Sequence, residues 1–407
     1  MVRLPKSFPV SDYTPHGYID NPHHSMVLHR SGAIRSVPPL GFGYWLTAFE
    51  GSYGGGQRAH VNYLSLLLMA VGVGEASFAE PEDFDAHSVR LVSNYHTKHL
   101  VSYDWAFDGL SFSLKFALPR EDSLACLAEI ANACEAPRTI LLHATNVYGL
   151  WDTRYWGSDG VAARYAERAD AIVSKVWAYG HAFALGADRP SAAHKATADE
   201  AQWLDWIRRG DIGSLPGGSV VGPGPLRAVQ SYEVAVPAGG RASVLVVLAR
   251  GTNEERALAE LRRGLRTFRP SVRKQLADDE AFWSQAPMLE GDWPAAWKHG
   301  WVYDYETLRM NVREPIGIYK HHWDAMQIHS PRSVLGEASL DSMALSYAGP
   351  ALAQDVLLGT FADAPAPNVP CSREDGSMNM VAADGSECGT YPADRRAVGL
   401  SSAPGRN

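Results

Sequence analysis

Cysteine is scarce in this chain of 407 residues, and none of the four cysteines forms a Cys-x-x-Cys pair. Such isolated cysteines predict reduced thiols rather than a disulfide framework. No His-Glu-x-x-His motif or comparable ligand spacing occurs among the 15 histidines. The sequence therefore offers no support for a metal site, and no cofactor is expected.

Long apolar runs are also missing. No run reaches 18 apolar residues, and the N-terminal stretch lacks the apolar core of a signal peptide. These two absences predict a soluble, cytoplasmic protein that does not enter a membrane. The formal net charge of −8 gives no basic surface for nucleic acid, so a nucleic-acid partner is not expected. Nothing in the sequence indicates an oligomeric state.

Aromatic residues, by contrast, are abundant, with 12 tryptophans and 17 tyrosines. Large rings dominate the burial of protein cores, and they also form faces on which sugar rings stack. Composition alone favours the interpretation that these aromatic residues pack in the core. An interpretation as sugar-binding residues therefore needs support from particular motifs.

The first 250 residues read as β-structure. Apolar and polar residues alternate from Leu110 to Phe116, directly after the hairpin signal Asp108-Gly109. Further strands are expected at 139–148 and 243–248, where β-branched residues are frequent. Strands separated by turns, without a regular βαβ alternation, predict an antiparallel β-sandwich. Two helical interruptions are expected, at the start of 161–179 and over 192–209.

Near residue 251 the pattern becomes helical. Thr252 is expected to cap one helix, a second helix is expected over 271–283, and Asp292 is expected to cap a third that Pro294 opens. The third carries a continuous apolar stripe formed by Trp297, Trp301, Tyr305 and Leu308. The sequence thus predicts a multidomain protein, β first and α second. Its parts are a β-sandwich with an inserted helix over 1–250, a helical linker over 251–290, and a helical domain over 291–407.

This order of domains resembles the six-hairpin glycosidases, with glycoside hydrolase family 63 and the trehalases as the nearest comparisons. The resemblance is carried by the sandwich opening at 17–22, 31–32 and 39–43, by the tryptophan-rich helix at 293–309, and by the segment 331–342. That segment is similar to the trehalase stretch in which an arginine and a glutamate precede Trp-Asp-Ser, with Leu340 in place of the tryptophan. In a second alignment, Trp323-Asp324 is the Trp-Asp pair of the family, and both alignments remain open.

The resemblance implies that 291–407 begins an (α/α)6 barrel and that the activity is inverting hydrolysis of an oligosaccharide or α-glucoside. In such enzymes the two catalytic carboxyl groups come from later helices, so the resemblance assigns no catalytic residue here. It implies instead that five residues of the segment 323–341 contact the sugar: Trp323, Asp324, Arg332, Glu337 and Asp341.

The chemistry of these residues suits that role. Carboxylates and an arginine can bridge pairs of sugar hydroxyls, and an indole can stack on the apolar side of a pyranose. Within the expected helix, Glu337 and Asp341 are four residues apart and share a face. Each has an alternative structural role: Trp323 as a core or lid ring, Arg332 as the partner of Glu337, and Asp341 as a solvated helix residue. Asp304 and Glu306 in the preceding helix are expected on the surface.

From Trp293 to Asn407 the chain has 115 residues, whereas twelve barrel helices with their connections need roughly 300. The last residues after 392 show no helical periodicity. We therefore expect a truncated barrel that lacks at least one catalytic carboxylate and is inactive. Two other hypotheses stay open: a noncatalytic carbohydrate-binding protein, and a structural or assembly module without a ligand.

Overall fold

The computed structural model describes residues 18–20, 24–28, 41–47, 52–53, 57–58, 62–120, 122–150, 160–176, 181–210, 220–223, 226–325, 332–364, 371–372 and 376. The chain forms two compact units. Unit 1 comprises 1–21, 26–45 and 61–277, and unit 2 comprises 22–25, 46–60 and 278–407. The expected domain limits at 250 and 290 stay a prediction.

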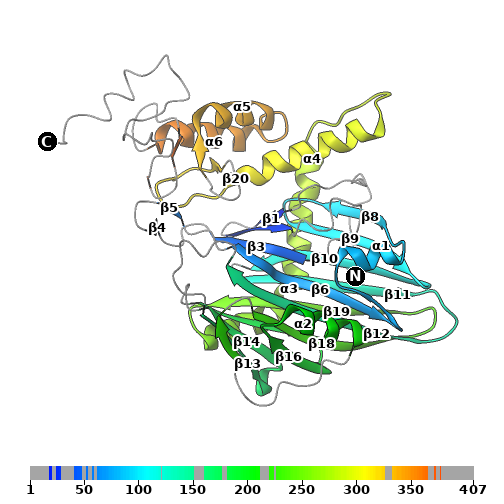
Figure 1. Ribbon diagram of the computed structural model, residues 1–407. Helices are drawn as coiled ribbons and strands as arrows, with labels where there is room; N and C mark the ends of the chain where they lie inside the picture. Colours follow the sequence, from blue (N-terminus) through cyan, green and yellow to red (C-terminus); the bar gives the residue numbers. More distant parts are fainter. Residues whose placement is uncertain are drawn as a thin grey trace. The chain divides into compact units, whose positions relative to one another are not determined.

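Two antiparallel sheets make up most of unit 1 (Figure 1). The eight-stranded sheet contains, in spatial order, β1 (Tyr18–Asp20), β2 (His24–Leu28), β3 (Gly41–Thr47), β6 (Asn62–Val73), β12 (Arg138–Leu150), β18 (Leu226–Val236) and β16 (Ala193–Thr197), and β7 (Ala76–Phe78) pairs with β6. The nine-stranded sheet runs β17 (Val220–Pro223), β13 (Gly160–Ala166), β14 (Ala171–Val176), β15 (His181–Ala187), β19 (Arg241–Gly251), β11 (Ser123–Asn132), β10 (Leu110–Arg120), β9 (Leu100–Phe107) and β8 (Leu91–His96).

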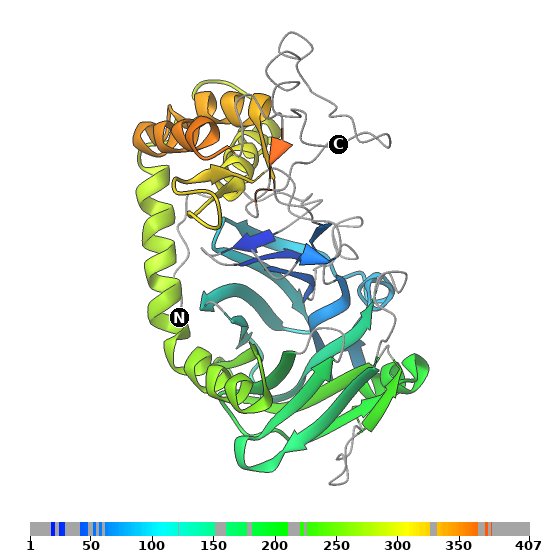
Figure 2. The same cartoon turned by 90° about the vertical axis from the view of Figure 1, so that its left-hand side faces the viewer.

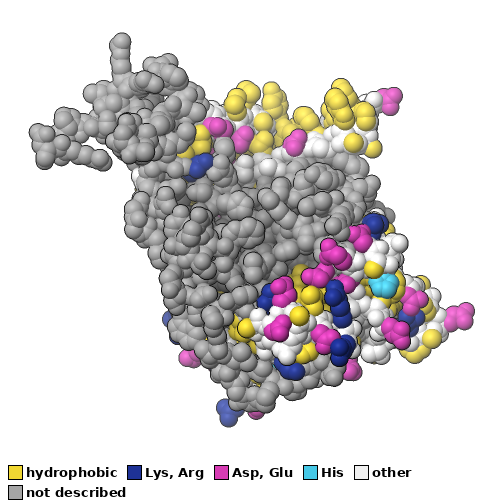
Figure 3. Space-filling model, viewed as in Figure 1, with side chains coloured by type: hydrophobic (Ala, Val, Ile, Leu, Met, Phe, Trp, Pro, Cys, Tyr) yellow, Lys and Arg dark blue, Asp and Glu magenta, His cyan; other side chains and the backbone are white. Residues whose placement is uncertain are grey.

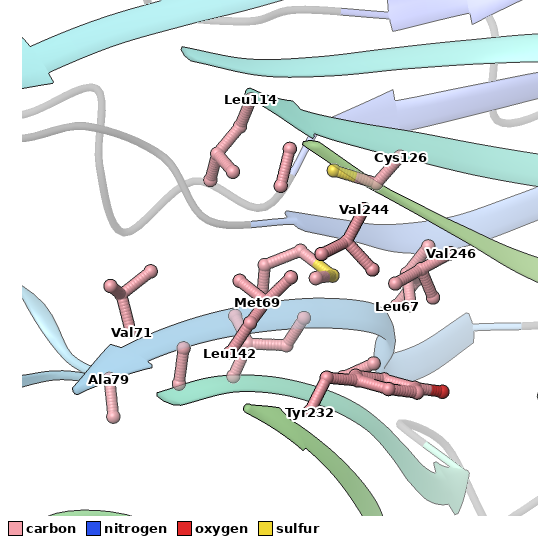
Figure 4. Close-up of a cluster of buried hydrophobic side chains, with 14 of the residues drawn as sticks. Leu67, Met69, Val71, Ala79, Leu114, Cys126, Leu142, Tyr232, Val244 and Val246 are labelled. Atoms are coloured by element: carbon pink, nitrogen blue, oxygen red, sulfur yellow. The ribbon is translucent and has the colours of Figure 1, made fainter. Parts of the chain in front are cut away.

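The main core lies between these sheets. Figure 4 shows Met69 and Leu142 of the first sheet facing Leu114 and Val244 of the second, and all four side chains are buried. The alternation in β10 sets this arrangement, because Leu110, Phe112 and Leu114 point inward while Ser111 is exposed. The antiparallel strands expected at 110–116, 139–148 and 243–248 are therefore present.

The hairpin between β9 and β10 forms at the predicted dipeptide. Asp108 and Gly109 both have positive φ, 49° and 73°, which is the conformation of a type I′ turn. The cross-strand register places Leu110 opposite Phe107. The turn thereby fixes which residues of β10 face the core.

Helix α3 (Glu254–Trp283) covers the outer face of the nine-stranded sheet within unit 1 (Figure 2). Its residues Leu261, Phe268 and Val272 pack in one cluster with Val247 and Leu127 of the sheet. The helix is continuous through Pro270, so the two separate helices expected here are one. Pro270 lies on the exposed side, where water can satisfy the carbonyl that the ring leaves without a partner.

Several other local predictions are corrected. The expected helix at 161–179 is the hairpin of β13 and β14 joined by the 3-10 turn η3 (Glu167–Ala169), because sheet pairing overrides its helix-forming composition. The expected helix at 192–209 begins with strand β16, and only α2 (Glu200–Arg209) is helical. Asn253, not Thr252, caps α3, since its Oδ1 accepts the Arg256 N–H at 2.9 Å. A short helix, α1 (Pro81–Ala86), was not predicted.

Unit 2 contains three helices among its described residues. They are α4 (Ala295–Asn311), α5 (Leu335–Leu345) and α6 (Pro350–Ala362). Short strands connect them: β20 (Val312–Arg313) with β21 (Trp323–Asp324), and β22 (Ser333–Val334) with β23 (Cys371–Ser372). A further pair, β4 (Ser52–Tyr53) and β5 (Gln57–Arg58), also belongs to this unit. Pro294, not Asp292, is the N-cap of α4.

The helices of unit 2 bury only part of their apolar surface. Val312, Leu345, Ala353 and Val356 form a small core. The predicted stripe of α4 is only partly buried, because Tyr305 is buried but Trp297 is 61% exposed. Figure 3 shows hydrophobic side chains gathered over α5 and the beginning of α4; the exposed ones include Leu340, Met343 and Tyr347. None of the described helices is long and apolar enough to cross a membrane.

Candidate functional site

The predicted site residues Trp323 and Asp324 form strand β21, which pairs with β20 at the end of α4. Val312 lies opposite Asp324, and the Ala325 N–H donates to the Asn311 carbonyl at 2.7 Å. These bonds place the Asp324 carboxyl beside the C-terminal end of α4.

Trp323 is a buried anchor of this strand. It is 1% exposed, and its ring stacks on Tyr319 with 4.5 Å between ring centroids and 7° between planes. Its Nε1–H donates to the Glu314 carbonyl at 3.1 Å. Both the ring and its polar group are therefore engaged within the protein.

Two histidines before Trp323 attach the strand to α6. The backbone N–H and the Nδ1 of His322 meet Asp355 Oδ2 at 2.9 and 2.6 Å. His321 meets Asp363 Oδ2 in the same way, at 3.0 Å for each contact. Gly359 of α6 permits this approach, because an added Cβ would lie 2.8 Å from the Cβ of His321. The histidine pair thus holds the loop in place.

Two carboxyl groups, those of Asp324 and Asp341, interact at the centre of the site, and that of Glu337 lies near enough to influence them electrostatically. Asp324, from β21, is 1% exposed, and its carboxyl lies near enough to that of Asp341 on α5 for a hydrogen bond when one of the two is protonated. Neither oxygen of Asp324 has a donor among the described residues while both groups are charged, so the bond requires a proton on one of them. Glu337, one turn before Asp341 on α5, adds a third negative charge nearby. The predicted sharing of a face by Glu337 and Asp341 places both beside Asp324.

Burial determines where the proton resides. It raises the pKa of Asp324 well above its usual range, and the charges of Asp341 and Glu337 raise it further. Burial also raises the pKa of Asp341, although hydrogen bonds from Asp324 and the Asn311 side chain oppose that change. We infer from these directions that Asp324 is the protonated member and donates to the Asp341 carboxylate.

Arg332 lies just before β22, which neighbours β21. In the described part of the chain it forms no ion pair with Glu337, and its Nε is buried without a hydrogen-bond partner. A buried guanidinium donor of this kind is costly unless a ligand or water accepts it. The alternative role of Arg332 as the structural partner of Glu337 is not supported.

A second group of buried charges joins α4 to the end of α3. Arg309 Nη1 contacts Asp279 Oδ1 at 2.6 Å and Glu306 Oε1 at 3.3 Å, and Trp283 Nε1–H donates to the same Glu306 oxygen at 2.5 Å. Glu306 is 1% exposed, so its expected surface position is wrong. Its charge is compensated, which indicates a structural network rather than an acid or base.

Sequence reasoning also missed Asn311. As the last residue of α4 it has no motif around it, and only the turn from α4 into β20 brings it to Asp341. No group of three or more His, Cys, Asp and Glu side chains in the described ranges is arranged to hold a metal ion. Cys126, Cys134 and Cys371 are free thiols.

No protein-family model matches the sequence, and no curated protein matches it significantly. Among solved structures, a bacterial glucoamylase complexed with acarbose is similar with a TM-score of 0.56 and 10% identity, over 93% of this chain and 55% of that one. A protein assigned as a kojibiose phosphorylase from the human microbiome gives a TM-score of 0.47 and 10% identity, over 89% and 53%. A family GH92 α-mannosidase from Bacteroides thetaiotaomicron gives 0.37 and 12%, over 70% and 37%.

The similarity to the glucoamylase concerns the fold. This chain shares the architecture of antiparallel sheets followed by helices with part of that enzyme. It spans about half of the length of the glucoamylase and phosphorylase chains. At such low identity, function has to be argued from the residues of the site.

Proposed function

We propose that this protein is a glycoside hydrolase of the six-hairpin type, and that the cluster of Asp324, Glu337 and Asp341 is a sugar-binding subsite of unit 2. In this proposal α4, α5 and α6 are the first helices of an (α/α)6 barrel. The substrate is an oligosaccharide or α-glucoside, and hydrolysis proceeds with inversion. The observation that carries the proposal is the meeting of β21 with α5, which brings the buried Asp324 carboxyl to Asp341 and near Glu337.

Each side chain has a defined task. The half-buried Asp341 carboxylate and Glu337 accept hydrogen bonds from hydroxyl groups of the sugar. The protonated Asp324 carboxyl donates a hydrogen bond to the Asp341 carboxylate, which fixes the orientation of the Asp341 oxygens. The Arg332 guanidinium supplies donors to the same sugar, so that a pair of neighbouring hydroxyls is bound from two sides. Because Trp323 is buried against Tyr319, we assign it the positioning of Asp324 rather than stacking on the sugar.

The carboxyl pair itself does not cleave the bond in this proposal. Inverting glycosidases separate their two carboxyl groups by about 6.5–9.5 Å, and retaining ones by about 5–5.5 Å. Asp324 and Asp341 share a hydrogen bond, which brings their oxygens closer than either arrangement. The general acid and base are therefore other residues, and Asp324 and Asp341 act in substrate binding.

A noncatalytic carbohydrate-binding protein is the second candidate function. The short separation between the Asp324 and Asp341 carboxyl groups favours this candidate. Two groups so close can bind a sugar, but they cannot lie on opposite sides of a glycosidic bond. The two candidates differ in one product: the hydrolase releases reducing sugar, and the binding protein does not.

The test is titration calorimetry of the full chain with maltotetraose, together with an assay of released glucose. We expect Asp341→Asn to weaken binding by about 10- to 150-fold, because a hydrogen bond to a charged group contributes about 1.5–3 kcal/mol. Glu290→Gln is the matched control, since Glu290 is an exposed carboxylate of the same unit. Unchanged binding in the Asp341 variant would refute the subsite. Binding without glucose release would select the second candidate, and inversion is read from the anomer that first appears by NMR.

A further inference from the structure

Unit 1 has a hollow on the outer face of the nine-stranded sheet. The hollow has a volume of about 500 Å³ and is lined by residues of β8, β9, β10, β11, β19 and α3. This volume is within the range of small-molecule sites, about 300–1,000 Å³. The residues of the carboxyl cluster in unit 2 do not line it.

The register of the strands explains the hollow. Ala106, Ser111 and Ala131 lie opposite one another on three adjacent strands. These small side chains form a low floor, and Arg241 on β19 lies opposite Ala131 at one end of the row. The floor is a consequence of the two-residue alternation of β10, whose inward positions are occupied by the core residues Leu110 and Phe112.

Polar groups form the adjoining row. Asp104, Ser113, Glu129 and Ser243 lie opposite one another across β9, β10, β11 and β19. Asp104 and Glu129 are two strands apart, which separates their backbones by about 10 Å. Glu129 accepts from Lys115 through Oε2, which leaves Oε1 to accept from a ligand. Arg241 and Arg269 add donors at the edge of the hollow.

We propose that this hollow binds a short neutral oligosaccharide, as a site additional to the subsite of unit 2. Carboxylates, serines and arginines within one hollow offer both acceptors and donors to a ligand rich in hydroxyl groups. Because the hollow contains side chains of both signs, a charged ligand would be repelled by the side chains of its own sign. A neutral sugar is repelled by neither. Val92, which is 66% exposed and lines the hollow, supplies an apolar contact. The choice of a glucan as the probe rests on the proposed function. The inference that the hollow is a ligand site does not depend on that function.

The variant Ser111→Arg tests the site. Ser111 is exposed at the centre of the floor, and its diagonal cross-strand neighbours are Asp104 and Glu129. A long guanidinium there fills the floor and pairs with these carboxylates, which removes both space and acceptors. Ala235→Arg is the matched control, because Ala235 is exposed on β18 and lies opposite the exposed Thr139.

Binding of maltoheptaose is measured by calorimetry in the full chain carrying Asp341→Asn, so that the subsite of unit 2 is weakened. We expect this protein to retain binding, Ser111→Arg in the same background to weaken it at least tenfold, and Ala235→Arg to leave it unchanged. Circular dichroism and the urea midpoint verify that each variant folds. Absence of binding in the Asp341→Asn protein, or equal binding with and without Ser111→Arg, would overturn the proposal. If Asp341→Asn binds as the unmodified chain does while Ser111→Arg loses binding, the sheet site holds and the unit 2 subsite fails.

Discussion

Replacing Arg309 with methionine should destabilise unit 2 strongly, because the change leaves two buried carboxylates without their shared cation. Asp279 is 0% exposed and Glu306 is 1% exposed, and Arg309 Nη1 contacts both at 2.6 and 3.3 Å. The guanidinium also lies over the ring of Phe282, 4.6 Å from its centroid. Breaking a buried ion pair by removing one partner costs about 3–5 kcal/mol. Methionine keeps most of the volume, so the effect reports on charge rather than on a cavity.

The assay is urea unfolding followed by circular dichroism at 222 nm. Arg273→Met is the control, since Arg273 is exposed on α3 and its Nε donates only to the Arg269 carbonyl among the contacts described for it. We expect less than about 0.5 kcal/mol from that control. The double variant Arg309→Met with Asp279→Asn should recover much of the loss, because only Glu306 then remains charged, with Trp283 as a donor. A loss below about 1 kcal/mol in Arg309→Met, or no recovery in the double variant, would refute the charge argument.

Three further changes test other parts of the fold. Burial raises the pKa of Asp324, so the native state loses stability as pH rises from about 4 toward that raised value, by about 1.4 kcal/mol for each tenfold difference in proton affinity. Asp324→Asn should remove this loss and be the more stable protein at pH 8 in urea titrations. Parallel curves of stability against pH for the two proteins would contradict this expectation. The hydrogen bond to Asp363 raises the pKa of His321. The stabilisation from this pair is therefore complete below about pH 6.5 and is lost as pH rises through the raised value. His321→Gln should differ in stability from the unmodified chain at pH 6 and match it at pH 9, and the effect should be small because the ring is partly exposed to water. Leu142→Ala in the sandwich core should cost about 2–5 kcal/mol in urea unfolding, against little change for the exposed Leu340→Ala.

The sheets could be predicted where a strand alternates or is rich in β-branched residues. The alternation from Leu110 and the dipeptide Asp108-Gly109 are local signals, and both act on residues adjacent in sequence. The hairpin of β13 and β14 could not be predicted, because alanine and arginine over 162–168 favour a helix. Its strands exist because β13 and β14 pair with each other and with their neighbours in the nine-stranded sheet, and pairing between distant segments leaves no local pattern.

The caps and breaks of helices were also hard to predict, because they depend on tertiary surroundings that the local sequence does not contain. Proline at 270 predicts the end of a helix, yet α3 continues because that position faces solvent and the helix packs on the sheet on its other side. Exposure decides the outcome, and exposure depends on where the sheet lies. Glu306 illustrates the reverse case: a charged residue in an amphipathic helix is expected outside, and a partner from α3 brings it inside.

In the candidate site, residue spacing in the sequence predicted some features and missed others. The four-residue interval between Glu337 and Asp341 predicts a shared helix face, and α5 has that face beside Asp324. The raised pKa of Asp324 was beyond prediction, since it depends on burial of that side chain and on the charges of Asp341 and Glu337. Three elements must meet before either carboxyl group acquires its role. The Trp-Asp dipeptide and the Asp-Ser dipeptide, which gave two competing alignments, both contribute an aspartate to one hydrogen bond. This contact does not decide between the two alignments, and a sugar that binds Asp341 should lose affinity when Asp324 is changed as well.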